Sequence, residues 1–455
     1  MTERYLDASA NEPTEIRWTL AQLSWTLADA ARDPYISLVT AFIFPAYFVN
    51  HLVGDPIEGQ ALWGLAMGVS MFGVAILAPL LGAVADQMGS RKPWIVMLLI
   101  VGSGSMLALW YAEPGQSGVV MLVMVLASIA MIADELSLVF TNAMLPTLAH
   151  SSQFGRLSGI GWAIGFGSSV FMLLFFQQSS WLDFEFDNFE LERFSTILAG
   201  IWYAVFLVPI LVFANDIPNT GVRLPRAFMA GSASILRTFL AVGSFRNVLL
   251  FLVANGLAAG TAISFMFFAG IYAAEVFSWG TETLGLLGFE MIIGAAIFAI
   301  VGGMMDDHIG GKKNLMIAIG SSLLIYALMA TITSSSIGPI NFISEPNKSF
   351  GLFGSPPEQI YHLLNFLQGG AMGMIMTSGR SLLSRISAPS MLGEFYGLDK
   401  MGRAIASFFA PLLISFLTVV FQSQRLGIFS VMLCMSALSF FLIYFVVEER
   451  SESLL

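Results

Sequence analysis

The sequence predicts an all-α integral membrane protein whose twelve transmembrane helices form two pseudo-symmetric six-helix bundles. Three observations predict this fold class: an apolar composition, twelve apolar segments, and a loop motif that occurs once in each half of the chain. Of the 455 residues, 56% are hydrophobic and only 11% are charged, and the mean hydropathy is +0.79. A soluble domain averages about 25% charged residues, so an ordinary soluble protein is excluded.

A transmembrane helix needs about 20 predominantly apolar residues. Segments of this kind lie at 18–48, 60–85, 93–112, 117–147, 154–178, 194–215, 246–274, 283–306, 313–335, 358–384, 395–421 and 426–447. An even number of crossings places both termini on the same side of the membrane. The 43 glycines are typical of helices that pack closely in lipid.

The basic residues predict which side that is. Most Lys and Arg residues flank the ends of the segments on the side of the two termini. Examples are Arg91, Lys92, Arg156, Arg223, Arg226, Arg237, Arg246, Lys312, Lys313 and Arg385. Because such residues gather on the cytoplasmic side, we expect a multi-pass protein of the cell inner membrane with both termini cytoplasmic. The net charge of −10 argues against a nucleic-acid partner.

The segment 217–245 separates the two halves, which we place at 1–216 and 246–455. It carries Arg223, Arg226 and Arg237 among apolar residues. This mixture predicts a cytoplasmic linker with an amphipathic helix that lies on the membrane surface. An unstructured linker is the alternative.

The repeated loop motif has the pattern G-x-x-x-D-x-x-G-x-(R/K)-K and follows the second and the eighth segment. Its residues are Gly82, Asp86, Gly89, Arg91 and Lys92 in the first half, and Gly303, Asp307, Gly310, Lys312 and Lys313 in the second. Glycine permits close helix packing and a tight turn. The acid is then free to cap the N-terminus of a neighbouring helix, where an anion is stabilised. Two unrelated basic loops would not share this spacing.

These paired loops resemble the signature loop of the major facilitator superfamily. The resemblance implies a major facilitator fold, in which two bundles rock about a central site, and a gate locked by Asp86 and Asp307 with their loops. Three further stretches narrow the family, at residues 25–35 with 42–48, 140–149 with 158–165, and 379–386 with 393–400 and Pro411. They resemble the autophagy-related vacuolar effluxer family and its bacterial members. The resemblance implies efflux of amino acids for the vacuolar members and leaves the substrates of the bacterial members open. The chain departs from the family pattern at Arg32 and Asp33.

Charged residues near the middle of the first segment predict a functional site. Asp29, Arg32 and Asp33 lie there, and each costs at least ~2.5–3.5 kcal/mol at the bilayer centre. Helical spacing places Trp25, Asp29 and Asp33 on one face. Pro34 disfavours helical geometry at Asp33, and an interrupted helix beside ionisable groups is typical of transporter binding sites.

The fourth segment carries two more acids, Asp134 and Glu135, near its middle. In the fold that the resemblance implies, the first and fourth segments both line the central cavity. Arg32 then has up to four carboxylates within reach, and not all of them can ionise in a low dielectric. The candidate ion-coupling residues are therefore Asp29, Asp33, Asp134 and Glu135, as proton carriers or as part of a sodium site, and Asp29 is the first choice because it lies in the family-like stretch 25–35. The alternative is an ion-pair network that only fixes helix packing.

Other polar and aromatic residues are candidates for contact with a solute. Cations would bind its acidic group, aromatic rings would stack on it, and amides would bind its polar groups. The candidate set is Arg32, Trp25, Tyr35, Asn142, Trp162, Asn255, Gln368, Lys400 and Arg403. Packing is the alternative role for most of them. We expect Arg380 and Arg385 to make gate or headgroup contacts, and Asp86 to dock at the start of the eleventh segment.

The sequence therefore predicts a secondary active transporter of a small polar solute, most simply an amino-acid-like or zwitterionic one, coupled to protons or else to sodium. The chain has no phosphate-binding G-x-x-x-x-G-K-[ST] loop and no metal-site spacing among its histidines. We expect no enzyme activity, no cofactor and no metal, and a monomer in contact with membrane lipid. A cation-coupled sugar symporter of the glycoside–pentoside type, a passive uniporter and a non-transporting membrane assembly partner remain alternatives.

Overall fold

The computed structural model describes residues 18–177, 190–240, 245–279, 281–342 and 354–448. Helices account for most of this part of the chain. The first half contains α1 (Leu20–Pro34), η2 (Tyr35–Phe42), α2 (Phe44–Tyr47), η3 (Phe48–Val53), α3 (Pro56–Met88), α4 (Lys92–Ala108), η4 (Leu109–Tyr111), α5 (Val119–Ala143), α6 (Leu145–Leu148), η5 (Ser151–Gln153), α7 (Phe154–Gln177) and α8 (Glu190–Phe213).

Helix α9 (Leu224–Leu240) connects this half to the second. The second half contains α10 (Arg246–Phe277), α11 (Thr281–Ile309), α12 (Gly311–Met329), β1 (Ser336–Ile337), β2 (Ile340–Asn341), α13 (Pro356–Ile386), η8 (Pro389–Met391), α14 (Leu392–Phe421) and α15 (Gln424–Tyr444). Each predicted apolar segment coincides with one of the long helices, if α1 is counted together with the short helices that continue it.

Among the described residues, ten helical segments are long and apolar enough to cross a membrane. The ninth and tenth predicted spans, α12 and α13, are not among these ten. Helix α13 carries Glu358, His362, Asn365 and Arg380, which make it more polar than its neighbours. These side chains are buried because α13 packs against α7, α10, α11 and α12. A helix that is enclosed by other helices does not need an apolar surface.

The first span is irregular in a way that the sequence predicts only in part. An interruption was expected beside Pro34, but the chain does not break there. Instead α1 passes into the π-helix η2, where the Ile43 amide donates to the Leu38 carbonyl, five residues earlier (3.1 Å). Proline lacks the amide hydrogen that continues an α-helix, and π-helical turns are frequent at functional sites.

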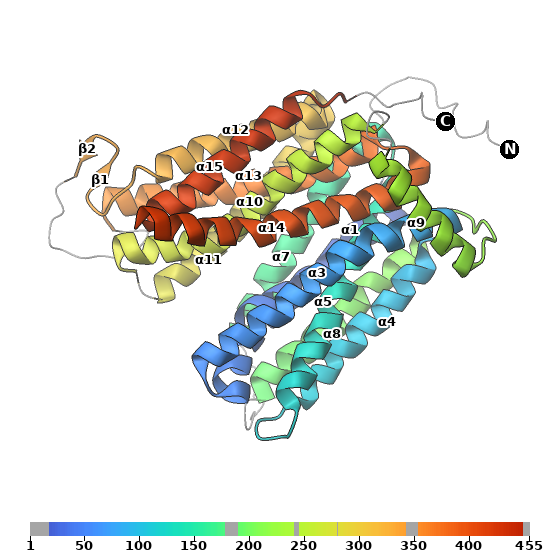
Figure 1. The fold of residues 1–455 in the computed structure, drawn as a ribbon, viewed down its shortest axis with the longest axis horizontal. Coiled ribbons are helices and arrows are strands. Elements are labelled where there is room, and N and C mark those ends of the chain that lie inside the picture. Colours follow the sequence, from blue (N-terminus) through green and yellow to red (C-terminus); the bar gives the residue numbers. More distant parts are fainter. Residues whose placement is uncertain (1–17, 178–189, 241–244, 280, 343–353, 449–455) are drawn as a thin grey trace.

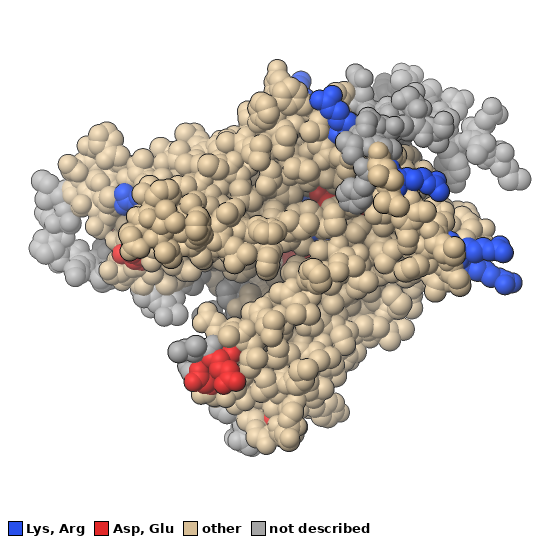
Figure 2. All heavy atoms as spheres, viewed as in Figure 1, with Lys and Arg blue, Asp and Glu red and all other residues tan. Residues whose placement is uncertain are grey.

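The helices form two lobes, shown in Figure 1. One lobe contains α1, α3, α4, α5, α7 and α8, and the other contains α10 to α15. They meet along two helix pairs, α3 with α14 and α7 with α11. The lobes converge at the end where α3 ends and α14 begins, which we call the closed end, and they diverge towards the opposite, open end. Figure 2 shows a notch between them at the open end.

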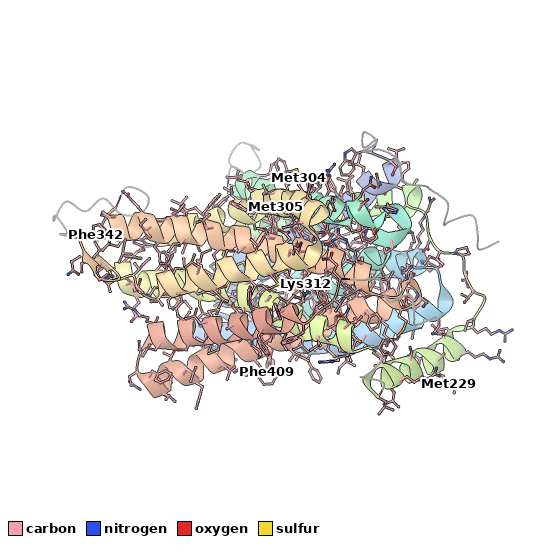
Figure 3. All side chains as sticks on the ribbon, turned by 90° about the horizontal axis from the view of Figure 1, so that it is seen from above. Met229, Met304, Met305, Lys312, Phe342 and Phe409 are labelled. Atoms are coloured by element: carbon pink, nitrogen blue, oxygen red, sulfur yellow. The ribbon has the colours of Figure 1, made fainter. Side chains whose placement is uncertain are left out.

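The surface matches a protein embedded in lipid. In Figure 2, Lys and Arg gather mainly at the closed end, and a broad band with few charged atoms covers the middle of the visible face. Large apolar side chains such as Phe409 and Phe416 of α14 are exposed there. In Figure 3, Phe409 lies on one side of the molecule, while Met229 and Phe342 lie at opposite ends of its long axis. The protein is a multi-pass integral membrane protein.

Helix α9 lies at the closed end, beside α3 (Figure 1). Ala227 and Gly231 are buried, and a Cβ atom on Gly231 would come within 2.9 Å of the Val84 amide nitrogen. Met229 is 74% exposed. The helix α9 thus lies in the segment where the sequence predicts an amphipathic helix, with small residues against α3 and apolar residues such as Met229 facing outward. Residues 241–244 of that segment lie outside the described part.

Candidate functional site

The deepest charges of the first lobe form a network between α1 and α5. The Nη2 atom of Arg32 lies 2.7 Å from Oδ2 of Asp134 and 3.7 Å from Oε1 of Glu135. Its Nε also donates to the Asp134 carbonyl (3.3 Å). All three side chains are buried. Two of the four predicted carboxylates therefore form ion pairs with Arg32.

A second set of charges reaches this network from α14. Lys400 forms an ion pair with Glu135 across the boundary between the lobes. One turn further along, Arg403 pairs with Asp399 (2.7 Å), and Asn255 of α10 donates to the same carboxylate (2.6 Å). The Lys400 and Arg403 side chains remain 17% and 13% exposed. Lys400 and Arg403 are therefore more accessible than Glu135 and Asp399, the acids that they contact.

Asp29 pairs with Arg380 rather than with Arg32. The two groups come from different lobes, and Oδ2 of Asp29 lies 2.6 Å from Nη1 of Arg380. The guanidinium lies over two indole rings, with its Cζ atom 5.0 Å from the centre of Trp25 and 4.7 Å from that of Trp162. Sequence reasoning expected Arg380 nearer the membrane surface, with gate or headgroup contacts. Arg380 does connect the two lobes, but it lies beside Asp29 and not at the gate loops.

Asp33 forms no ion pair among the described residues, whereas Asp29, Asp134 and Glu135 do. Its Oδ2 atom is buried and has no hydrogen-bond partner there; Oδ1 of Asp134 has none either, but the other oxygen of Asp134 pairs with Arg32. A Cβ atom on Gly165 of α7 would come within 2.5 Å of the Asp33 Oδ2 atom. Any residue larger than glycine at this position would therefore displace the carboxylate. An ionised carboxylate without a partner is costly to bury. The arrangement leaves one acid of the cluster able to take a proton or a cation.

The remaining candidates of the solute set make other contacts. The Tyr35 hydroxyl donates to the Ala127 carbonyl (3.0 Å), which fixes η2 against α5. Asn142 is buried near the closed end of α5. Gln368 donates to the Tyr326 hydroxyl (2.7 Å) of α12, within the second lobe. The structure thus brings Trp25, Arg32, Trp162, Asn255, Lys400 and Arg403 into contact with the acids or with cations that pair with them. Tyr35 and Gln368 instead bond to other groups.

The repeated loops dock as predicted. Asp86 accepts hydrogen bonds from the amides of Gly393 (3.0 Å) and Glu394 (2.8 Å) at the start of α14. Asp307 accepts from the amides of Gly155 (2.9 Å) and Arg156 (3.0 Å) at the start of α7. Each acid therefore caps a helix of the opposite lobe, where an anion is stabilised by the free amides. The two contacts are related by the internal repeat.

The glycines of the motif act as predicted too. Gly89 and Gly310 have φ of +85° and +90°, a conformation that side chains with a Cβ atom rarely adopt. Gly82 packs directly on the backbone of Gly393, and a Cβ atom on Gly303 would meet the Gly155 carbonyl oxygen at 2.5 Å. Close packing of α3 on α14 and of α7 on α11 depends on these small residues.

Sequence reasoning missed three acids at the closed end. Asp216 accepts from the amides of Arg91 (3.0 Å) and Lys92 (2.9 Å), and Glu448 accepts from those of Gly311 (2.7 Å) and Lys312 (3.0 Å). These two acids follow the last helix of each half, and that shared position is the signal that could have found them. Asp306 pairs with Arg385 (2.6 Å), and Ala85 occupies its place in the first repeat, so the repeat gave no signal for it.

The basic residues of the motif make separate contacts. Arg91 pairs with Asp86 (3.2 Å), and the Lys312 Nζ donates to the Tyr444 carbonyl (2.7 Å), while Lys313 is exposed. Arg385 also contacts Asp307 (3.3 Å) and Glu448 (3.1 Å). Within the part of the chain that the structure describes, no three His, Cys, Asp or Glu side chains are grouped as metal ligands would be.

The lobes, their paired loops and the charges between them define a transporter of the major facilitator superfamily. Solved structures agree on the fold. The transporter FucP in the outward conformation matches with a TM-score of 0.67 at 13% identity, over 94% of this chain and 98% of that one. The proton:xylose symporter XylE matches with a TM-score of 0.65 at 15% identity, over 95% of each chain.

The chain belongs to the family described as "Vacuole effluxer Atg22 like", whose model matches residues 47–453. This result confirms the resemblance seen in the sequence motifs. A relative from Bacillus subtilis (strain 168), the uncharacterized MFS-type transporter YxiO, is 21% identical over 446 residues, which is 96% of either chain. The family and the fold are those of transporters rather than enzymes.

Proposed function

We propose that the protein is an ion-coupled secondary active transporter that moves a small polar solute by alternating access. The observation that carries the proposal is the charged network between the lobes, in which Glu135 of α5 binds Arg32 of its own lobe and Lys400 of the other. A rocking motion of the lobes separates Glu135 from Lys400. A solute or an ion that replaces one partner lowers the cost of that separation.

The preferred solute is amino-acid-like or otherwise zwitterionic. The network presents Arg32, Lys400 and Arg403 to a carboxylate, and Asp29 and Asp33 to an ammonium group. The preferred coupling ion is the proton, and Asp33 is the first candidate to bind it because its Oδ2 has no partner among the described residues. Asp29, Asp134 and Glu135 complete the ion-coupling set. Sodium is the alternative ion.

The proposed direction is efflux. A cytoplasmic position for the closed end and for both termini is supported by the positive-inside rule, because Lys and Arg gather mainly at the closed end in Figure 2. The moving units are residues 1–216 and 246–455, joined by the linker 217–245. The protein acts as a monomer in the cell inner membrane, and the contacts of Asp86 and Asp307 hold its cytoplasmic gate shut in this state.

The test begins with a thermal-shift screen of amino acids, peptides, sugars and organic ions on the purified protein. Solutes that raise the melting temperature are then offered to proteoliposomes under an imposed pH or sodium gradient. Uphill accumulation of an amino-acid-like solute that requires the pH gradient supports the proposal. Downhill equilibration alone indicates a uniporter. No binding and no transport of any solute indicates a non-transporting partner and overturns the proposal.

A cation-coupled sugar symporter is the second candidate. The observation that favours it is the placement of acids on α1 beside acids on α5, together with a fold shared with a proton:xylose symporter. Sugar accumulation that depends on a sodium or pH gradient, with no response to amino acids, would select this candidate over the first.

A further inference from the structure

We propose that Trp25, Trp162 and Asp29 form a binding site for the ammonium or guanidinium group of the solute, and that Arg380 occupies this site as a tethered substitute while the closed end is shut. The inference rests on the proposed function, because it assigns part of the solute to one place. It names organic cations and cationic ends of zwitterions as the class that the site accepts.

The geometry around Arg380 is that of a cation site. Its guanidinium lies between two indole faces, 5.0 Å from the centre of Trp25 and 4.7 Å from that of Trp162. The carboxylate of Asp29 contacts Nη1 at 2.6 Å. Paired aromatic faces with a carboxylate are the arrangement by which proteins bind organic cations. Nothing in this site requires the cation to belong to the protein.

The three binding groups and their occupant come from different lobes. Trp25 and Asp29 lie on α1 and Trp162 lies on α7, all in the first lobe, whereas Arg380 lies on α13 of the second. The Arg380 carbonyl accepts a hydrogen bond from Tyr396 of α14 (2.9 Å), so Arg380 is held within its own lobe. When the lobes part at the closed end, Arg380 leaves and the three groups stay behind together.

The site keeps its shape without Arg380. The Trp25 Nε1 donates to the Thr141 carbonyl of α5 (2.7 Å), which fixes the indole. Trp162 stacks on Phe166 of the same helix, with ring centres 5.6 Å apart. A Cβ atom on Gly161 would collide with Oδ2 of Asp29 and would lie 3.3 Å from Nη1 of Arg380. Glycine at this position leaves the room that a cation and a carboxylate share.

This arrangement exchanges one cation for another. In the other conformation, in which the lobes have parted at the end that is shut in this structure, a solute cation enters there. It neutralises Asp29 in place of Arg380. When the closed end shuts, Arg380 returns to the site and displaces the solute towards the open end. Asp29 is therefore never left as an unpaired buried charge, a state that proteins avoid because of its desolvation cost. The exchange is reversible, so the solute and ion gradients set the direction of net transport, and the exchange is compatible with efflux.

The test uses methylguanidinium as the probe and Arg380→Ala as the emptied site. Methylguanidinium chloride is expected to raise the melting temperature of Arg380→Ala in a saturable way, beyond the effect of equal sodium chloride. Wild type is expected to show a smaller rise at the same concentration, because the tethered Arg380 competes for the site. Adding Asp29→Asn to Arg380→Ala abolishes the rise, and adding Trp162→Leu weakens binding about tenfold, since an aromatic face is lost. Arg380→Gln, with a short neutral side chain, repeats the test if Arg380→Ala does not fold.

Two results would overturn the inference: no saturable response in either Arg380 variant, or an equal response after Asp29 is neutralised. The readout is equilibrium binding and needs no ion gradient, so its failure differs from failure of transport. Binding without any transported solute would remove the proposed function and leave the site. Transport of neutral or anionic solutes alone, without methylguanidinium binding, would leave the proposed transport function and remove the cation site.

Discussion

At the scale of single residues, the costliest feature of this chain is the charge that it holds far from water. An unpaired charge at the bilayer centre costs at least ~2.5–3.5 kcal/mol. Arg32 and Lys400 both form ion pairs with Glu135, and Asp29 forms an ion pair with Arg380. Pairing offsets the cost only while both partners are present. When the lobes part, each ion pair between them breaks. The conformation of the molecule therefore depends on whether a solute or an ion takes the place of the lost partner.

Removing one partner of the Glu135 pair should show this cost directly. We expect Lys400→Met to lower the unfolding free energy by on the order of 3 kcal/mol, because Glu135 is left short of a cation in a buried place. Adding Glu135→Gln should restore part of the loss. Thermal unfolding of the two single variants and the double variant measures the coupling. Strict additivity of the two changes would contradict the ion pair.

The sequence could predict which residues carry the site, but not how they pair. Asp29, Arg32, Asp134 and Glu135 stand out because charge is rare within apolar segments. Helical spacing suggested that Asp29 and Arg32 share a side, yet Asp29 pairs with Arg380, which lies far away in the sequence and in the other lobe. Such a contact depends on how the lobes close, and local spacing carries no information about that.

At the scale of elements, the lobes hold together where helices touch through glycine. Gly82 of α3 packs on the backbone of Gly393 of α14, and Gly155 of α7 packs on Gly303 of α11. Backbone cannot move aside as a flexible side chain can. These contacts require the closed end to be shut. They therefore stabilise this conformation relative to one in which that end is open.

Enlarging one of these glycines should open the closed end. In Gly82→Ala, the new methyl group collides with the Gly393 carbonyl, and we expect a longer distance between spin labels placed at His150→Cys and Lys313→Cys in a Cys434→Ser background. All three native side chains are exposed. Gly68→Ala is the matched control on the same helix, because its methyl group meets nothing within 4 Å. Equal distances in the two variants would contradict the role of Gly82.

Helix α9 supplies a second contact at the closed end. Its Ser234 (2.6 Å) and Thr238 hydroxyls both donate to the carboxylate of Glu394. The Glu394 amide in turn donates to Asp86. One residue of α14 is thus held by α3 and by the linker. The sequence predicted an amphipathic helix here, but the small polar residues that bind Glu394 gave no sign of their partner.

Loss of these hydroxyls should loosen α9. We expect Ser234→Ala with Thr238→Val to cost about 1–3 kcal/mol, since a buried carboxylate loses two donors. Amide hydrogen exchange in α9 should then become on the order of tenfold to a hundredfold faster. Ser232→Ala is the control, because Ser232 is exposed and bonds only within its own helix, to Phe228. Unchanged exchange in the double variant would show that α9 is held by its contact with α3 alone.

At the scale of the whole molecule, the internal repeat and the fold could be predicted from the sequence. The conformational state, meaning which end of the molecule is shut, could not. Composition, twelve apolar segments and two matched loops were sufficient for the lobes of Figure 1. The sequence does not say which end of the molecule is shut, because both arrangements use the same helices. The positions of Asp86 at α14 and of Asp307 at α7 show the end with the loops closed.

The most direct measurement of the central claim compares wild type with Asp33→Asn in proteoliposomes under an imposed pH gradient, with a solute that raises the melting temperature of the protein. Asparagine has nearly the shape of the carboxylate but cannot take up a proton, and Asp33 Oδ2 has no hydrogen-bond partner among the described residues that the change would remove. Glu58→Gln, at an exposed carboxylate near the open end, is the control and should accumulate solute normally. The account predicts uphill accumulation by wild type and only equilibration by Asp33→Asn. Equal accumulation by wild type and Asp33→Asn would contradict it.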